Sequence, residues 1–289
     1  MIGYLTQSTP RAAGPVTTAG RVAAKSLLPA CLLVLATTFG AVAQGQPAKE
    51  SYEPQVGQAG KDVVWVPTPQ SLVDKMLEIA KATPKDYLID LGSGDGRTVI
   101  TAAKRGMRAH GIEYNPQMVE VAQKAAKAAG VSEKATFEKA DLFESDFSKA
   151  QIITMFLLPW INEKLAPKLL QLEPGTRIVS NTFTMGDWQA DETATVTDDC
   201  TNYCKALLWI VPAKVEGTWK LGEAELTLKQ SNQMLTGTLG STEITEARMR
   251  GKDISFKVGN ASYTGTLDGK TLTGTVTGGS GSTWTATLK

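Results

Sequence analysis

Histidine and cysteine are scarce in this chain of 289 residues, which contains one histidine and three cysteines. No group of His, Cys, Asp and Glu residues has the spacing of a metal site, and no serine or cysteine stands in a nucleophile motif. A phosphate-binding loop is also missing. The single histidine, His110, lies inside an expected strand, where we expect a packed residue and not a catalytic base. These absences argue against metal-dependent chemistry and against covalent catalysis.

A large excess of either charge is absent as well. The chain has 30 basic and 29 acidic residues, which gives a formal net charge of +1. Removal of the first 43 residues would take away three basic and no acidic residues and change that charge to −2. A nearly neutral chain lacks the basic surface on which binding to phosphate backbones depends. We therefore expect no nucleic-acid partner.

The first 43 residues have the composition of a targeting segment. Three basic residues precede an apolar run at 27–43, which ends in Ala41-Val42-Ala43. A basic start, an apolar centre and small residues at the end are typical of a secretory signal peptide. The alternative is an uncleaved membrane anchor formed by residues 27–43. Both predict that the remaining chain is exported to the cell envelope, either periplasmic or attached to the membrane.

Three further segments follow the targeting segment. Residues 44–60 are polar and rich in Gln, Gly and Pro, so we expect a linker. Residues 61–213 alternate between strand-like and helix-like patterns, which predicts an α/β domain. Residues 214–289 contain eight short, threonine-rich runs separated by glycine. These runs predict a small antiparallel β barrel or sandwich.

The α/β segment has the order of a Rossmann-like fold. Strands are expected at 87–89, 108–113, 135–140, 151–158 and 177–183, and an antiparallel hairpin at 194–197 and 205–211. Helical patterns follow the first, second and fourth of these strands. This alternation predicts a parallel sheet with helices on both faces, completed by the hairpin, and a ligand site at the carboxyl ends of the strands.

Cys200 and Cys204 lie between the two strands of that hairpin. In a fully extended segment their Cα atoms would be about 13 Å apart, which is too far for a disulfide. A turn would bring them together, and an oxidising compartment would favour the bond. We expect a disulfide, with two free thiols as the alternative.

A glycine-rich turn connects the first expected strand to the following helix. Asp90 ends the strand, and glycines follow at 92, 94 and 96, whereas a dinucleotide-binding fingerprint requires its third glycine at the position of Arg97. The glycines allow the backbone to approach a ligand, and the carboxylate of Asp90 would repel a pyrophosphate but attract a cation. This favours S-adenosyl-L-methionine, a cationic adenosine cofactor without phosphate. A tight turn without a ligand is the alternative.

Two more acidic residues end the next expected strands. Glu113 ends the second strand, where a carboxylate can accept hydrogen bonds from both ribose hydroxyls of an adenosine. Asp141 ends the third strand, where it can accept from the adenine amino group while Leu142 and Phe143 line the ring. Each acid alone is typical of a solvated charge or a helix cap. Their order at successive strand ends indicates an adenosine cofactor.

Residues 62–188 resemble the class I S-adenosylmethionine-dependent methyltransferases. Within this class, Val66-Pro67-Thr68-Pro69 followed by Asp90-Leu91-Gly92-Ser93-Gly94-Asp95-Gly96-Arg97 is similar to the family of the ATP synthase c-subunit lysine N-methyltransferase. The resemblance implies N-methylation of an amine such as a protein lysine. The cofactor contacts that it implies, together with the strand-end acids, are Val66, Pro67, Thr68, Pro69, Asp90, Gly92, Ser93, Gly94, Gly96, Glu113, Tyr114, Asp141, Leu142 and Leu157.

The acceptor side of the site is less clearly marked. Candidates that follow the fifth strand are Asn181, Asp187 and Trp188, with packing of a turn and lid as the alternative. Candidates for the wall of an acceptor channel are Trp65, Phe156 and Trp160. Many amino methyltransferases carry an Asn/Asp-Pro-Pro-aromatic motif where this chain has Phe156-Leu157-Leu158-Pro159. The missing polar head argues against a direct hydrogen bond to an acceptor amine there.

Two other functions remain open at this point. S-Adenosylmethionine is a cytoplasmic metabolite, so an exported protein could keep the fold as a binding protein without turnover. A methyltransferase of a small molecule, such as a quinone or a lipid amine, could use an apolar pocket in the β domain. The expected partner is therefore an amine-bearing protein or a small-molecule acceptor, and the sequence leaves the oligomeric state open.

Overall fold

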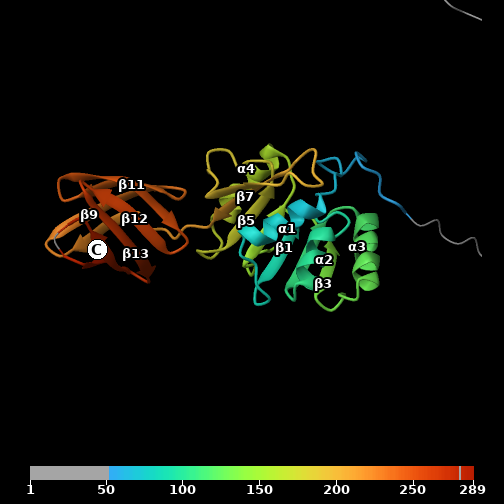
Figure 1. Cartoon of the computed structure of the whole chain (residues 1–289), viewed down its shortest axis with the longest axis horizontal. Coiled ribbons are helices and arrows are strands. Elements are labelled where there is room, and N and C mark those ends of the chain that lie inside the picture. The colour runs from blue at the N-terminus through green and yellow to red at the C-terminus, as the bar shows by residue number, and fades with distance from the viewer. Residues whose placement is uncertain (1–51, 280) are drawn as a thin grey trace, which may run out of the picture. The chain divides into compact units, whose positions relative to one another are not determined.

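The computed structural model describes residues 52–279 and 281–289. The predicted signal peptide or membrane anchor at 1–43 and the first part of the predicted linker lie outside these residues. Figure 1 shows an α/β domain, coloured blue to yellow, that is followed along the chain by a β domain coloured orange to red. None of the helices in the described ranges has the length and apolar character needed to cross a membrane.

A sheet of seven strands forms the centre of the α/β domain. Its strand order is β3-β2-β1-β4-β5-β7-β6. The first five strands in sequence pair in parallel, and β7 pairs antiparallel with both β5 and β6. This confirms the predicted Rossmann-like sheet with a terminal antiparallel hairpin. The strands are β1 (Tyr87–Leu91), β2 (Arg108–Glu113), β3 (Ala135–Lys139), β4 (Ile152–Met155), β5 (Arg177–Asn181), β6 (Glu192–Thr195) and β7 (Lys205–Ile210).

Helices cover both faces of the sheet. They are α1 (Gln70–Ile79), α2 (Arg97–Lys104), α3 (Pro116–Ala128) and α4 (Pro159–Leu169). Side chains from α1, α2 and α3 share one buried cluster with Leu88, whereas α4 packs into a second cluster with Ile89 and Leu91. Neighbouring residues of a strand point to opposite faces, so β1 contributes to both clusters. Its carboxyl end is thereby fixed in the middle of the sheet.

The start of α3 shows why local sequence defines these elements. The side chain of Asn115 accepts a hydrogen bond from the backbone N–H of Gln117 at 2.9 Å, and Pro116 occupies the first helical turn. An asparagine cap satisfies a free N–H group, and proline needs no partner at this position. The helix therefore begins directly after β2, which places Glu113 beside a helix N-terminus.

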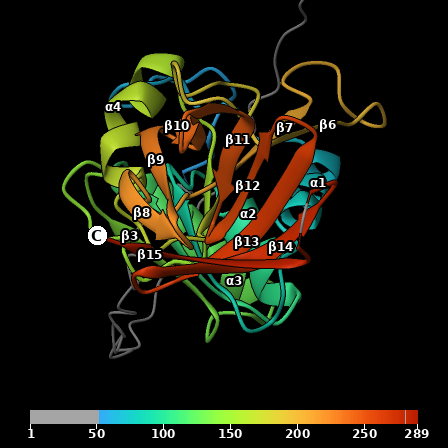
Figure 2. The ribbon, with the colours of Figure 1, turned by 90° about the vertical axis from the view of Figure 1, so that its left-hand side faces the viewer.

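The eight threonine-rich runs form a closed antiparallel barrel, as Figure 2 shows. Its strands are β8 (Gly217–Leu221), β9 (Ala224–Ser231), β10 (Met234–Leu239), β11 (Thr242–Arg250), β12 (Asp253–Val258), β13 (Ala261–Asp268), β14 (Thr271–Thr277) and β15 (Thr283–Leu288). Trp219, Phe256 and Trp284 are buried in its core, and the Phe256 ring stacks on Tyr263 at 4.7 Å. Large side chains thus occupy the interior, which argues against the apolar ligand pocket of the small-molecule hypothesis.

The described part of the predicted linker is not a free connector. The N–H of Gly57 donates to the carbonyl of Trp65 at 2.8 Å, and the N–H of Trp65 donates to the carbonyl of Gln58 at 2.9 Å. The Gln58 amide also donates to Tyr52, and both side chains reach the sulfur of Met118 on α3. Backbone pairing with the segment before α1 therefore holds residues 57–60 against the α/β domain.

Close packing beneath the glycine turn gives a test of the fold. Gly96 precedes α2 with a φ of 80°, and a Cβ there would lie 2.7 Å from the Phe137 ring. Gly130 follows α3 with a φ of 69°, and a Cβ there would meet nothing within 4 Å. We expect Gly96→Ala to lower the free energy of unfolding by about 3 kcal/mol, against about 1 kcal/mol for Gly130→Ala. Urea unfolding followed by circular dichroism measures both, and equal losses would contradict the packing argument.

Candidate active site at the carboxyl edge of the sheet

A cavity of about 530 Å³ lies at the carboxyl edge of the sheet. The ends of β1 to β4, the segment before α1, and two aromatic residues from later loops line it. The structure brings together all of the predicted cofactor residues except two. Those that line the cavity are Val66, Pro67, Thr68, Asp90, Gly92, Ser93, Gly94, Glu113, Tyr114, Asp141, Leu142 and Leu157.

The two exceptions, Pro69 and Gly96, lie at the N-caps of α1 and α2. Neither lines the cavity. Gly96 lies against Phe137 and Ala122, so it serves the packing of the turn on the sheet.

The glycine turn forms a cradle into which a ligand can fit. A Cβ at Gly94, whose φ is 54°, would lie 2.6 Å from Nε1 of Trp65, so a side chain has no room there. The hydroxyl of Ser93 is buried and has no hydrogen-bond partner among the described residues. A cradle without side chains and an unpaired buried hydroxyl suit a polar ligand at the turn.

The carboxylate of Glu113 joins two loops of the site. One of its oxygens accepts from the N–H of Gly94 at 2.9 Å, and the other accepts from the N–H of Asn115 at 2.9 Å. Hydrogen bonds to an ionised acceptor are stronger than neutral ones. Glu113 therefore holds the glycine turn against the start of α3, with lone pairs left for further donors.

Arg97 lines the cavity, although it is not among the predicted cofactor residues. Its side chain pairs with Asp95 at 2.6 Å and donates to the carbonyl of Thr68 at 2.9 Å. It thereby joins the glycine turn to the segment Val66-Pro67-Thr68. In the sequence Arg97 stands where a dinucleotide fingerprint requires its third glycine, and it ends the motif that carries the family resemblance.

Lys61 is a second cavity residue that was not predicted. It directly follows the predicted linker at 44–60. Its ammonium group lies 2.6 Å from the carboxylate of Asp141 and 4.8 Å from the centre of the Tyr114 ring. The Lys61 hydrogen bond holds the pKa of Asp141 below its ordinary value, and the same contact raises the pKa of Lys61. The pair connects the segment before α1 to the end of β3, although both partners remain accessible to solvent.

Asp90 has the opposite electrostatic environment. It is buried, and its carboxylate accepts a hydrogen bond from the hydroxyl of Thr154 at 2.7 Å. Burial raises the pKa of Asp90 to about 7, and the nearby charges of Asp95 and Glu113 act in the same direction. Thr154 opposes this rise because it stabilises the ionised form. A bound cation would favour the ionised carboxylate and lower the pKa.

The predicted acceptor residues after β5 do not face the cavity. Asn181 is fully buried, and its amide donates to the hydroxyl of Thr68 at 3.3 Å. Trp188 is buried in the core, where its carbonyl accepts from the indole N–H of Trp209. Asp187 is exposed and does not line the cavity. None of these three candidates lines the cavity, although Asn181 contacts Thr68, which does.

Aromatic residues, and not those three candidates, line the cavity. Trp65 and Phe156 line the cavity, as expected, whereas Trp160 on α4 is 47% exposed and lies outside it. Phe183 and Tyr203 also line the cavity, although neither is among the predicted site residues. Phe183 stands just beyond β5, and Tyr203 lies in the hairpin loop, so only the fold brings them to Phe156.

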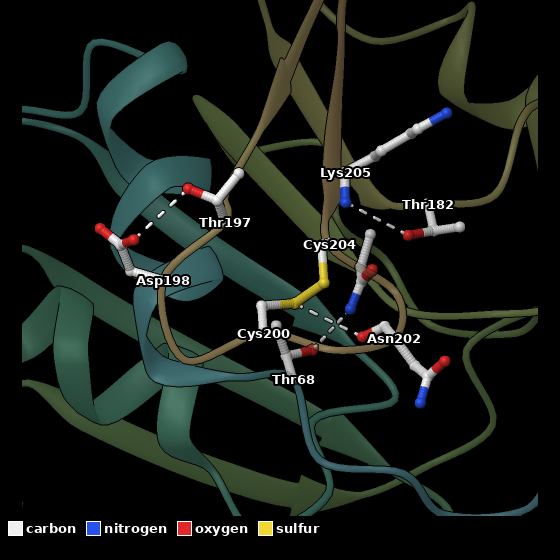
Figure 3. The surroundings of a disulfide bond; sticks show 9 residues. Thr68, Thr182, Thr197, Asp198, Cys200, Asn202, Cys204 and Lys205 are labelled. Atoms are coloured by element: carbon white, nitrogen blue, oxygen red, sulfur yellow. Dashed lines mark hydrogen bonds between the residues drawn. A yellow bond between two sulfur atoms is a disulfide. The ribbon is translucent and has the colours of Figure 1, made fainter.

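The predicted disulfide between Cys200 and Cys204 is present. The Cα atoms of the two cysteines are 5.8 Å apart. Figure 3 shows the bond in the loop before β7, close to Thr182 at the end of β5. The turn that the bond requires encloses Tyr203, whose backbone φ is 58°.

Comparisons with known proteins agree with this site. The model of the ANTKMT methyltransferase domain matches residues 90–192. A protein-lysine N-methyltransferase of Saccharolobus islandicus is 44% identical over 144 residues, which are 49% of this chain and 89% of the relative. The ATP synthase c-subunit lysine N-methyltransferase of Mus musculus is 35% identical over 130 residues, which are 45% of this chain and 52% of the relative. The chain thus spans only about half the length of the mouse protein.

A solved structure is similar to about half of the chain. It is an RNA methyltransferase of Salinibacter ruber in complex with S-adenosyl-L-homocysteine, with 46% sequence identity and a TM-score of 0.49. The match covers 52% of this chain and 96% of that protein.

The matched domain and the carboxyl-edge cavity define an S-adenosylmethionine-dependent methyltransferase. More narrowly, the chain belongs to the same family as the protein-lysine N-methyltransferase of Saccharolobus islandicus, and its residues 90–192 match the ANTKMT methyltransferase domain. The family match ends at Glu192 and therefore lies within the α/β domain.

The raised pKa of Asp90 predicts a pH-dependent affinity for the cofactor. The cation requires an ionised carboxylate, so the affinity for S-adenosylmethionine should fall as the pH decreases below about 7, by up to about tenfold per pH unit. Isothermal titration calorimetry between about pH 5 and about pH 8 measures this dependence. Asp90→Asn should remove it, and a persistent slope in that variant would assign the titration to another group.

A Thr154→Val variant and the pH-dependent stability of the ligand-free protein provide two controls for the role of Asp90. Loss of the hydroxyl that stabilises the carboxylate should move the midpoint of the affinity profile to higher pH. Because the pKa of Asp90 in the folded protein exceeds the ordinary value of 3.8, the ligand-free protein should lose stability as the pH rises from about 4 to about 7. Asp90→Asn should flatten that part of the stability profile.

Proposed function

We propose that this protein is a lysine N-methyltransferase that modifies another protein. The observation that carries the proposal is the 44% identity with a protein named protein-lysine N-methyltransferase, of which the match covers 89%. Relatives named for the ATP synthase c-subunit and for the adenine nucleotide translocase support the same acceptor class, because both names specify a lysine N-methyltransferase.

The contacts of the cavity suit this reaction. The glycine turn and Glu113 would hold the adenosine, with Asp141 at the adenine end, and Asp90 would offset the positive charge of the cofactor. When bound, S-adenosylmethionine supplies an activated methyl group on a sulfonium. The chain needs to align donor and acceptor and to exclude water, since orientation and preorganised charge can provide most of the acceleration.

The acceptor lysine must be neutral before it reacts. Its ammonium group gives a proton to solvent, and partial burial in the cavity favours the neutral amine because desolvation lowers the pKa of a lysine. No dedicated base is required for this step. An apolar cavity wall therefore assists the reaction by lowering the pKa of the acceptor.

We also propose that the protein acts in the cell envelope. The basic and apolar pattern of residues 1–43 supports export, and the Cys200–Cys204 disulfide suits an oxidising compartment. Cell fractionation with mass spectrometry of the N-terminus tests the location. Recovery of the protein in the cytoplasm with an intact N-terminus would contradict it.

The proposed activity predicts a specific loss in Glu113→Gln. This change removes the charge and places an amide N–H opposite one of two backbone N–H groups. We expect the Kd for S-adenosylmethionine to rise about 10- to 100-fold. With methyl-labelled cofactor and envelope extracts, the wild-type protein should label lysine side chains, identified by mass spectrometry, and the variant should label far fewer.

Glu138→Gln is the matched control for this experiment. Glu138 is an exposed acid on β3, outside the cavity, so its replacement should leave cofactor binding unchanged. Binding of the cofactor without labelled lysine in any envelope or soluble extract would contradict the proposed activity and favour the binding-protein hypothesis.

A further inference from the structure

The carboxyl edge of the sheet divides into two chemically different halves. On one side of the sheet's centre, Asp90 lies one residue before the end of β1, Glu113 ends β2, and Asp141 follows β3. On the other side, Phe156 follows β4 and Phe183 follows β5. Because β7 runs antiparallel, its start lies at this same edge, and the loop before it carries Tyr203.

We propose that Phe156, Phe183 and Tyr203 form the site for the acceptor amine, and that the Cys200–Cys204 disulfide holds Tyr203 in this site. The occupant is the alkylammonium end of a lysine side chain and its methylated products. This inference rests on the proposed function, because it assigns the acceptor class to one end of the same cavity.

The three rings are close enough to act as one surface. The ring centres of Phe156 and Phe183 are 6.0 Å apart, those of Phe156 and Tyr203 are 5.2 Å apart, and those of Phe183 and Tyr203 are 5.7 Å apart. The planes of the two phenylalanines differ by 22°, whereas Tyr203 is tilted by 60° and 53° to them. All three line the cavity.

Phe183 is held rigidly by buried polar groups behind it. Its carbonyl accepts from the hydroxyl of Ser180 at 2.8 Å and from the amide of Asn162 at 3.2 Å. Both residues are fully buried. Thr182, just before Phe183, has a φ of 61°, which is uncommon for a β-branched residue. Such backbone conformations persist where the surrounding structure holds them, and they cluster at binding sites.

Tyr203 is positioned by its loop and by the rings of Phe156 and Phe183. Its side chain is 41% exposed, and its neighbour Cys204 is fixed by the disulfide and by a backbone hydrogen bond from Val196 to the Cys204 carbonyl at 3.0 Å. The next residue, Lys205, pairs with Thr182, as Figure 3 shows for one of their two hydrogen bonds. The disulfide closes the segment 200–204 and so keeps Tyr203 opposite the two phenylalanines.

The chemistry of methyl transfer explains why aromatic faces suit this position. The amine lone pair forms the new N–C bond while the C–S bond breaks and its electron pair remains on sulfur. Positive charge therefore passes from sulfur to the acceptor nitrogen, and a proton that the product nitrogen later loses goes to solvent. The faces of aromatic rings attract cations, most strongly where water is excluded. The rings would stabilise the charge where it arrives without competing for the lone pair.

A pair of small probes tests the site without requiring turnover. Choline carries a trimethylammonium group, and 3,3-dimethylbutan-1-ol is its uncharged isostere of nearly the same shape. Both are titrated into the protein loaded with S-adenosylhomocysteine, and NMR chemical shifts report binding. We expect choline to bind about two- to thirty-fold more tightly than the alcohol. Equal affinities would overturn the proposal.

Variants test whether the three rings cause the preference for choline over the alcohol. Tyr203→Leu keeps an apolar side chain but removes the π face, and it should lower the preference for choline and lower kcat/KM for a lysine peptide. Tyr203→Phe should retain the preference. The exposed Trp160→Leu is the matched control outside the cavity. An unchanged preference in Tyr203→Leu, or an equal loss in Trp160→Leu, would overturn the assignment.

The role of the disulfide has its own test. A Cys200→Ser/Cys204→Ser double variant should lose the preference for choline as Tyr203→Leu does, while thermal unfolding shows that the domain remains folded and calorimetry shows unchanged binding of S-adenosylhomocysteine. Full retention of the preference would overturn the disulfide's part in the site. A fall in cofactor affinity of the same size would indicate general damage and would also count against it.

The choline-binding and lysine-labelling experiments can fail independently of each other. Preference for choline that depends on Tyr203, with no lysine labelled in any extract, would support the ammonium site and reject the protein-lysine acceptor. Labelled lysine with no such preference would support the activity and reject the aromatic site.

Discussion

Close approach of the backbone at the glycine turn is the constraint on which the site depends. Trp65 leaves no space for a side chain at Gly94, and Phe137 leaves none at Gly96. This lets the N–H of Gly94 reach the carboxylate of Glu113 on the neighbouring strand. Strand β1, strand β2 and the segment before α1 are thereby held around one space. The cavity follows from this packing, because side chains at the turn would fill it.

The acids around the cavity show how one chemical group serves different purposes. Asp90 is buried, and desolvation raises its pKa to about 7. Asp141 is accessible and paired with Lys61, which lowers its pKa. Glu113 remains bound to backbone N–H groups. Asp90 can respond to a cation, and Asp141 holds the segment before α1 through Lys61. Glu113 joins the glycine turn to the start of α3. Burial and hydrogen bonding, and not residue type, decide among these roles.

Local sequence signals predicted most of the fold. The Asn115-Pro116 pair marked the start of α3, and the alternating runs marked all eight barrel strands, because capping and period-two patterns act over a few residues. The cofactor half of the site could be predicted for the same reason, since its acids end consecutive strands. The meeting of Phe156 with Phe183 and Tyr203 could not be predicted, because these residues belong to segments that come together only through the pairing of β4, β5 and β7.

The sequence by itself determined the Rossmann-like sheet, the barrel, the type of cofactor and the acids at its end of the cavity. These properties depend on periodicity, glycine spacing and strand-end chemistry, which are all local. Tertiary structure decided that Asn181 and Trp188 are buried, that Lys61 reaches Asp141, and that a disulfide loop brings Tyr203 to the cavity. Such contacts join residues far apart in the chain, and no local pattern encodes which strand edges will meet.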